Sequence, residues 1–410
     1  MRESSDSWKG ISMLAKAKAI QSQLSAWRRD FHMHPELGFQ ETRTAGKVAE
    51  LMEGFGYRVR RGVGRTGVLA DLGAGSPRLA IRADMDALPL QECTGAAYAS
   101  QVSGVMHACG HDAHIACALG AALLLSREQF PGSVRFLFQP SEEVNDAEGL
   151  SGAPRMIADG ALEGVDAVLA LHVDPSAPCG AIRTVVGPAS GGVDSWSAEI
   201  VGRGGHGGYP NETLDPFFLT AQVINALNAI VSRRMDPFQP AVVSIGSVHG
   251  GQAENVIPER VTLTGTLRYT EKPVRALLQA EIRRAFEVAR ALGGNYGLKF
   301  DLGTPPMVNH PEMTALAAGV GRDLLGAGNV LPWRADLGAE DFGCFMDVVP
   351  GTMFTLGTHS AGPEYGLHNP NFDLDEDCLP IGAAMFAASA LRFFEKGIVI
   401  RKSLFVNCES

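Results

Sequence analysis

The stretch Met106-His107-Ala108-Cys109-Gly110-His111-Asp112-Ala113-His114 decides how this chain is organised. It combines a thiol, three imidazoles and a carboxylate, and the Ala- and Leu-rich residues 115–125 that follow predict a buried helix. Polar groups that open a buried helix are costly unless they bind something. Cys109 and His111 can converge on one ion, and thiolate and imidazole suit zinc and its neighbours. The other interpretation is a capped helix start with a structural cysteine.

Size and composition limit the class of protein. The chain has 410 residues, enough for two domains, and a net charge of −10 with a pI near 5.6 argues against nucleic acid or an anionic membrane as partner. Residues 1–20 contain no signal-peptide core, and we expect no run long and apolar enough to span a bilayer. The seven cysteines are scattered without a C-x-x-C motif, so we expect a reducing, cytoplasmic location.

The region before the opening stretch predicts a helix over residues 13–31, a second over 42–54 and short strands over 57–61 and 67–72. His32 and His34 lie just before a proline, where histidines more often brace a loop than bind metal. Residues 62–67 form a G-x-G-x-x-G, but a strand follows where a dinucleotide site requires a helix. These glycines therefore predict a hairpin.

Polar side chains repeatedly follow predicted strands. Asp84 and Asp86 come after the strand 78–82, at the edge where open α/β sheets place their active sites. Such a pair could also simply cap a loop. The alternation of strands and helices in this region predicts an α/β domain with a mainly parallel sheet and helices on both faces.

Two further strands end in the same way. Residues 133–139 lead to Glu142 and Glu143, and residues 166–171 lead to His172. Adjacent carboxylates repel unless a cation intervenes, so a metal could hold one and leave the other free as a base. A solvated acidic loop is the alternative.

The pattern changes after Pro188. Strands over 194–201, 241–248, 261–269 and 296–302 and helices over 214–232 and 273–292 follow the order β-α-β-β-α-β. We predict that residues 189–303 form an inserted two-layer, ferredoxin-like domain, and that residues 1–188 and 304–410 form the catalytic domain.

Three polar residues of the insertion stand out. His206 lies in a glycine loop, and an Asn and an Arg such as Asn255 and Arg268 suit a carboxylate if both point at it. Each taken singly is more often a surface or turn residue. The last part predicts a strand over 352–356, a loop with His368 and a closing helix over 380–394, and the tail 398–410 has no clear role.

The collected candidates point to a metal centre. Five potential ligands exceed one tetrahedral site, so two divalent ions with Cys109 as the bridge fit better: Cys109, His111, Glu143, His172 and His368. Zinc or manganese is expected, with cobalt or nickel possible.

The chain resembles the dinuclear metallo-aminoacylase and carboxypeptidase family. Within it, the similarity is to the branch of hippurate hydrolases, N-acyl-L-amino-acid amidohydrolases and indole-acetyl-amino-acid hydrolases. The resemblance covers nearly the whole chain and rests on motifs at residues 28–32, 35–38, 83–89, 107–112, 139–143, 205–207, 255–258 and 368–370.

This resemblance implies residue roles. Glu142 would be the general base and then the proton donor, and Asp86 would orient a ligand. His206 would stabilise the oxyanion, in this family usually by reaching across a dimer, and Asn255 and Arg268 would hold the substrate. Many relatives carry a metal-binding His where this chain has Asp84, so we leave Asp84 out of the ligand set. Ser141, often Ala in relatives, is not expected to matter.

The resemblance also implies a function. The protein would hydrolyse the amide bond of N-acyl amino acids, and the inserted domain would serve as lid and dimerisation domain of a homodimer or higher homo-oligomer. The alternatives are a metallo-exopeptidase acting on dipeptides and a non-catalytic metal-binding relative. A serine hydrolase is disfavoured because no G-x-S-x-G elbow is present.

Overall fold

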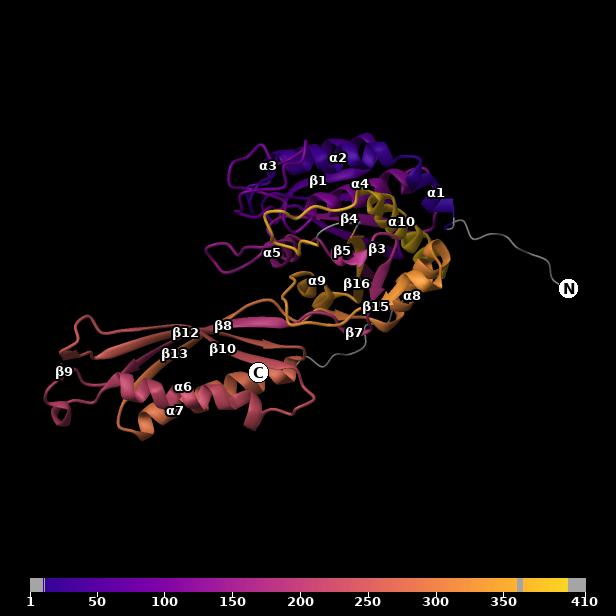
Figure 1. Ribbon diagram of the computed structural model, residues 1–410. Coiled ribbons are helices and arrows are strands. Elements are labelled where there is room, and N and C mark those ends of the chain that lie inside the picture. Colours follow the sequence, from indigo (N-terminus) through magenta and orange to yellow (C-terminus); the bar gives the residue numbers. More distant parts are fainter. Residues whose placement is uncertain (1–9, 11, 360–363, 397–410) are drawn as a thin grey trace. The chain divides into compact units, whose positions relative to one another are not determined.

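The structure is a computed structural model that describes residues 10, 12–359 and 364–396 (Figure 1). The chain divides into two compact units. The first comprises Met1–Ala189, Val308–Arg334 and Asp341–Ser410, and the second comprises Ser190–Met307 and Ala335–Glu340. The tail 398–410 lies outside the described residues.

The first unit is built on an eight-stranded sheet of order β1-β2-β4-β3-β5-β16-β6-β15. Its central neighbours β4-β3, β3-β5 and β5-β16 are parallel, which confirms the mainly parallel sheet. All but the first residue of β3 are buried, as expected for a strand covered on both faces. The strands are β1 Arg58–Val63, β2 Gly67–Gly73, β3 Arg78–Asp84, β4 Ser133–Gln139, β5 Ala167–Pro178, β6 Ile182–Thr184, β15 Val330–Pro332 and β16 Gly351–His359. A short pair, β7 Gly187–Pro188 and β14 Val308–Asn309, lies beside this sheet.

Helices cover both faces of this sheet, as predicted. The helices α4 and α10 pack on each other and on β3 and β5, whereas α9 packs on β5 and β16 from the other side (Figure 1). A Cβ at Gly120 of α4 would lie 2.8 Å from that of Ala383 in α10, so glycine permits this close packing. The helices are α1 Ser12–Lys18, α2 Gln21–Met33, α3 Thr42–Gly54, α4 His111–Leu125, α5 Gly152–Ala158, α8 Pro311–Leu325, α9 Phe342–Val348 and α10 Leu379–Lys396.

Two helix predictions need correction. The helix expected over residues 13–31 is broken at Ala19 and Ile20 into α1 and α2. In addition, one helix, Glu376–Lys396, is apolar and long enough to cross a membrane by length and composition. This helix is contrary to the expectation that no run is long and apolar enough to span a bilayer. Since 89% of its most apolar window is buried inside the protein, core packing accounts for that composition.

The second unit is a two-layer domain of the predicted β-α-β-β-α-β order. Its antiparallel sheet has the order β10-β12-β8-β13, and the two long helices pack on the same side of it around Trp196 and Phe286. Residues of β8 alternate between buried and more open positions because only one face is covered. The elements are β8 Gly192–Val201, α6 Pro216–Arg234, β10 Ala241–Gly250, β12 Arg260–Tyr269, α7 Lys272–Ala291 and β13 Asn295–Leu302, with a separate pair β9 Gly205–His206 and β11 Val256–Ile257.

The glycine-rich residues 62–67 form a hairpin, as predicted. The antiparallel strands β1 and β2 flank them, with Val63 paired to Gly67. Gly64 has a φ of +62°, and a Cβ there would lie 2.7 Å from the Met156 side chain. The glycines therefore serve a tight turn against α5.

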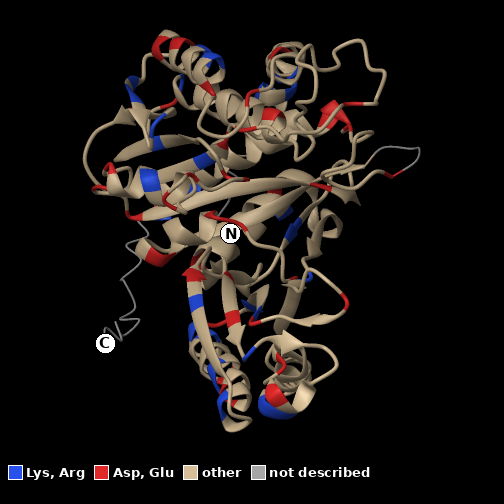
Figure 2. Ribbon diagram, turned by 90° about the vertical axis from the view of Figure 1, so that its left-hand side faces the viewer, with Lys and Arg blue, Asp and Glu red and all other residues tan. Residues whose placement is uncertain are grey.

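Acidic and basic residues are interspersed along the ribbon (Figure 2). Several basic side chains pair directly with acids, such as Arg135 with Asp71 at 2.7 Å and Arg275 with Asp194 at 2.7 Å. Local pairing thus neutralises part of the positive charge within each unit.

Candidate metal centre

The candidate site forms beside the middle of β5, where β3 and β4 end and α4 begins. Gly110 caps α4 with a φ of +82°, so Cys109 lies before the helix and His111 is its first residue. A Cβ at Gly110 would lie 2.5 Å from Val173 Cγ2 in β5. Only glycine therefore allows this turn to approach β5 closely enough to bring Cys109 to His172.

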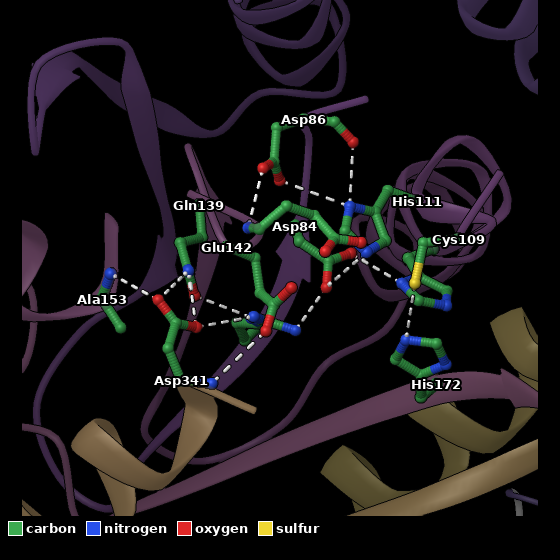
Figure 3. Close-up of polar contacts among 12 residues, drawn as sticks. Asp84, Asp86, Cys109, His111, Gln139, Glu142, Ala153, His172 and Asp341 are labelled. Carbon is green, nitrogen blue, oxygen red and sulfur yellow. Dashed lines mark hydrogen bonds and ion pairs between the residues drawn. The ribbon is translucent and has the colours of Figure 1, made fainter. Parts of the chain in front are cut away.

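The structure brings all five predicted ligands together. Their donor atoms form two groups, each within 4.8 Å, and both groups include Cys109. In the first group, Cys109 Sγ lies 3.5 Å from His172 Nε2 beside His111 (Figure 3). In the second, Glu143 Oε1 lies 3.0 Å from His368 Nε2. Strand β5 runs on to Pro178, so the prediction that it ends before His172 is wrong, and His172 projects from within it.

Backbone carbonyls orient two of the imidazoles. His111 Nδ1 donates to the carbonyl oxygen of Asp86 at 2.9 Å, and His172 Nδ1 donates to that of Val173 at 2.8 Å. With Nδ1 engaged, each ring has Nε2 as its remaining donor atom for a metal, and His111 Nε2 is buried without a hydrogen-bond partner among the described residues. The Asp86 carboxylate accepts the backbone N–H of Glu143 at 3.0 Å, which ties the two segments together.

The electrostatics of this donor set suit a cation. Burial raises the pKa of the Cys109 thiol well above its usual range. Burial also opposes ionisation of Glu143, but His368 and His111 hold the pKa of this carboxyl below its ordinary value. A divalent ion would ionise the thiol and satisfy the open imidazole nitrogen, so these residues fit a metal.

Asp84 Oδ2 lies 3.6 Å from His111 Nε2, and both carboxylate oxygens of Asp84 have further partners. Its Oδ1 lies 2.6 Å from His114 Nδ1, and its Oδ2 accepts from Arg82. His114 Nε2 in turn accepts the backbone N–H of Val173 at 2.9 Å. Burial lowers the pKa of His114 to about 4, so the ring is neutral with its proton on Nδ1. Asp84 and His114 thus support the site, a role for His114 that no sequence pattern indicated.

The segment before Glu142 is held more firmly than the sequence suggested. Ser141 is buried with a φ of +46°, its N–H donates to Glu41 Oε1 at 2.8 Å and its hydroxyl to the Val144 carbonyl at 2.7 Å. Glu142 Oε1 accepts the backbone N–H of Asp341 at 3.4 Å. Ser141 therefore has contacts that an alanine would only partly keep, contrary to the expectation that its identity is unimportant.

His32 and His34 brace loops, as the sequence favoured. His32 Nδ1 lies 2.8 Å from Asp112 Oδ2, and its Nε2 lies 3.4 Å from Glu92. His34 Nδ1 donates to the Asp30 carbonyl at 2.8 Å. His32 thereby holds Asp112, the residue after the candidate ligand His111.

Replacing His32 by Gln should destabilise the protein in a pH-dependent way. Burial opposes protonation of His32, but the carboxylates of Asp112 and Glu92 outweigh burial and raise the pKa of His32 to about 9. The other groups that face this ring are Arg28, Tyr98 and His107. A raised folded-state pKa stabilises the protein fully below the unfolded value of 6.5, and this contribution is lost as the pH rises through about 9. At pH 6 the free energy of unfolding of the His32→Gln variant should be about 3 kcal/mol below that of the unmodified protein, as measured by urea unfolding.

Leu24→Ala on the same helix is the matched control, since it removes buried apolar volume and no titrating group. Its destabilisation should be equal at pH 6 and pH 9.5. A His32→Gln effect that is also independent of pH would contradict the charged state assigned to His32.

The second unit carries the three remaining predicted residues. His206 and Asn255 lie together at the β9–β11 pair, where the Gly207 N–H donates to the Asn255 carbonyl at 2.8 Å, and both side chains are exposed. Arg268 lies in β12 and donates to the Leu337 carbonyl at 2.7 Å. Within the described second unit, no hydrogen bond or ion pair joins Arg268 to Asn255.

Comparisons with known proteins define the class. Residues 80–392 match the model of peptidase family M20/M25/M40. Thermostable carboxypeptidase 1 of Saccharolobus solfataricus is 38% identical over 94% of this chain and 100% of its own length. N-acetylcysteine deacetylase of Bacillus subtilis is 37% identical over 92% of this chain and 98% of its own. A Bacillus subtilis crystal structure, described as a dinuclear metal-binding M20 peptidase, is 34% identical with a TM-score of 0.80, covering 92% of this chain and 99% of that one.

The protein is thus a metal-dependent hydrolase of amide bonds. The chain belongs to peptidase family M20/M25/M40, which confirms the family resemblance inferred from the motifs.

Proposed function

We propose that this protein hydrolyses the amide bond of N-acyl amino acids with two divalent ions per chain. The observation that carries the proposal is that two three-residue donor groups share Cys109, with Glu142 beside Glu143 at their edge. The likeness to a dinuclear peptidase and to an N-acetylcysteine deacetylase supports it. The sulfur of Cys109 and the imidazole nitrogens favour zinc, whereas the carboxylate admits manganese.

The chain's own residues have distinct roles in this proposal. Cys109, His111 and His172 hold one ion, and Cys109, Glu143 and His368 hold the other. When bound, the ions polarise the substrate carbonyl and acidify water. Glu142, which is not needed as a ligand, removes a proton from the attacking water and returns it to the leaving amine. Asp86 orients His111 through its backbone carbonyl and Glu143 through its carboxylate.

The second unit contributes substrate recognition in this proposal. His206 stabilises the oxyanion, and Asn255 and Arg268 hold the substrate carboxylate or carbonyl; these three roles rest on the family resemblance. The same resemblance supports residues 189–303 as a lid and dimerisation domain of a homodimer. The part of the chain that the structure describes contains no disulfide, which supports a cytoplasmic location.

A metallo-exopeptidase acting on dipeptides is the second candidate. It is favoured by the 38% identity to a protein named as a carboxypeptidase. The two activities share the same bond chemistry and differ in whether the acyl part carries a free α-amino group.

Metal analysis combined with a substrate panel tests both candidates. We expect about two ions per chain and release of amine from N-acetyl, N-benzoyl or indole-acetyl amino acids, lost on chelation and restored by zinc or manganese. Faster release from dipeptides than from all N-acyl amino acids would favour the exopeptidase. A protein that binds no metal after reconstitution would refute the proposed centre.

A further inference from the structure

A buried ion pair between Arg82 and Asp341 has no part in the function proposed above. Arg82 lies in β3 and Asp341 directly precedes α9, and their side chains meet at 3.0 Å with 0% and 2% of their surface exposed. Removing two charges from water is costly, and a buried ion pair often stabilises a fold no better than apolar residues do. Stability alone therefore gives a weak reason for this pair, and its contacts suggest another.

The Asp341 carboxylate accepts hydrogen bonds from residues that precede Glu142 in the sequence and from residues that follow it. Gln139 Nε2 donates to both of its oxygens at 2.8 Å. Its Oδ2 also accepts the Ser151 hydroxyl at 2.6 Å and the Ala153 N–H at 3.1 Å. These donors lie at the end of β4 and the start of α5, so Asp341 closes the segment that carries Glu142 into a fixed loop.

The backbone of Asp341 then reaches Glu142 itself. Its N–H points to Glu142 Oε1 at 3.4 Å, and Figure 3 shows this contact beside the Gln139 and Ala153 contacts. Because the side chain is held by several donors, the position of this N–H is fixed as well. We propose that Asp341 is a positioning residue for Glu142, with Arg82 supplying the charge that keeps Asp341 in place. This inference rests on the proposed role of Glu142 as the base.

Arg82 extends the same network toward the metal ligands. It donates to Asp84, which engages His114, and His114 accepts the N–H of the residue after His172. One continuous set of buried polar contacts thus connects the anchor of the base with the strand that carries a ligand. Such a connection keeps the base and the metal centre in a constant relative geometry.

Asp341→Asn tests the proposal because it keeps the shape of the side chain but removes the charge that Arg82 pairs with. We expect kcat per metal-loaded enzyme to fall by about 10- to 100-fold with KM nearly unchanged and metal content retained. A crystal structure of the variant should have Glu142 Oε1 displaced from the backbone nitrogen of residue 341. Should Asp341→Asn fail to fold, Ser151→Ala, which removes one donor, should lower kcat by a smaller factor under the same assay.

Asn309→Asp is the matched control, because it makes the reverse exchange at another buried residue of the first unit. Asn309 bonds the carbonyls of Val185 and Met353. It should lower stability but leave kcat per metal-loaded enzyme unchanged. Full kcat in the Asp341 variant, or an equal loss of kcat in the control, would overturn the proposal. Turnover that survives Glu142→Gln would instead refute the base assignment, so the two failures are distinguishable.

Discussion

Replacing Glu142 by Gln should lower kcat by about 10²- to 10⁴-fold while the protein keeps its metal ions. The amide of Gln matches the size of the carboxyl group but cannot take a proton from water. Glu142 contributes to a candidate group with His111 and Glu143, but neither of the two groups that share Cys109 requires it. Initial rates on the best substrate of the panel and metal content of the same sample measure the two effects.

Glu143→Gln is the paired variant for this experiment. Glu143 lies 3.0 Å from His368 and belongs to a group around Cys109, so its loss should reduce metal content as well as turnover. The opposite result, with ions lost from the Glu142 variant and kept by the Glu143 variant, would reverse the assignment of these neighbouring carboxylates.

Cys109→Ala should have the largest effect on metal binding. It removes the donor that both three-residue groups share, so both ions lose a ligand at once. Changes of outer-shell partners already cost about 10- to 100-fold in metal affinity, so loss of a shared ligand should exceed this range. We expect less than about one ion per chain after dialysis, by mass spectrometry, and no measurable turnover.

Cys117→Ala is the control for this variant. Cys117 lies further along α4, is fully buried, and its thiol donates to the Leu379 carbonyl at 3.5 Å. It belongs to no candidate metal group among the described residues. The control should therefore retain its ions and its activity. A Cys109→Ala protein that also retains two ions would exclude the bridging role of this cysteine.

Elements whose burial pattern lies in consecutive residues could be predicted from the sequence, and elements that depend on distant contacts could not. Strand and helix periodicity correctly predicted the parallel sheet, the covering helices and the two-layer unit, because the pattern of burial is written in consecutive residues. The hairpin at residues 62–67 was predictable for the same reason. The helix break at Ala19 and Ile20 and the short helices α5 and α9 could not be predicted. Local helix propensity is weak in these segments, so tertiary packing determines where the helices begin and end.

For the candidate site, the sequence by itself determined the donor chemistry: a Cys-Gly-His turn, paired carboxylates and two separate histidines. Their convergence on two groups around Cys109 depends on the parallel pairing of β3 with β5 and on the close approach of Gly110 to β5, which no local pattern specifies. Only the tertiary structure revealed that Asp84 contacts Arg82 and His114, and that the backbone N–H of Asp341 donates to Glu142. These buried polar contacts join residues up to 259 positions apart in the chain. Their electrostatic strength depends on the low dielectric of the protein interior, which exists only after the chain has folded.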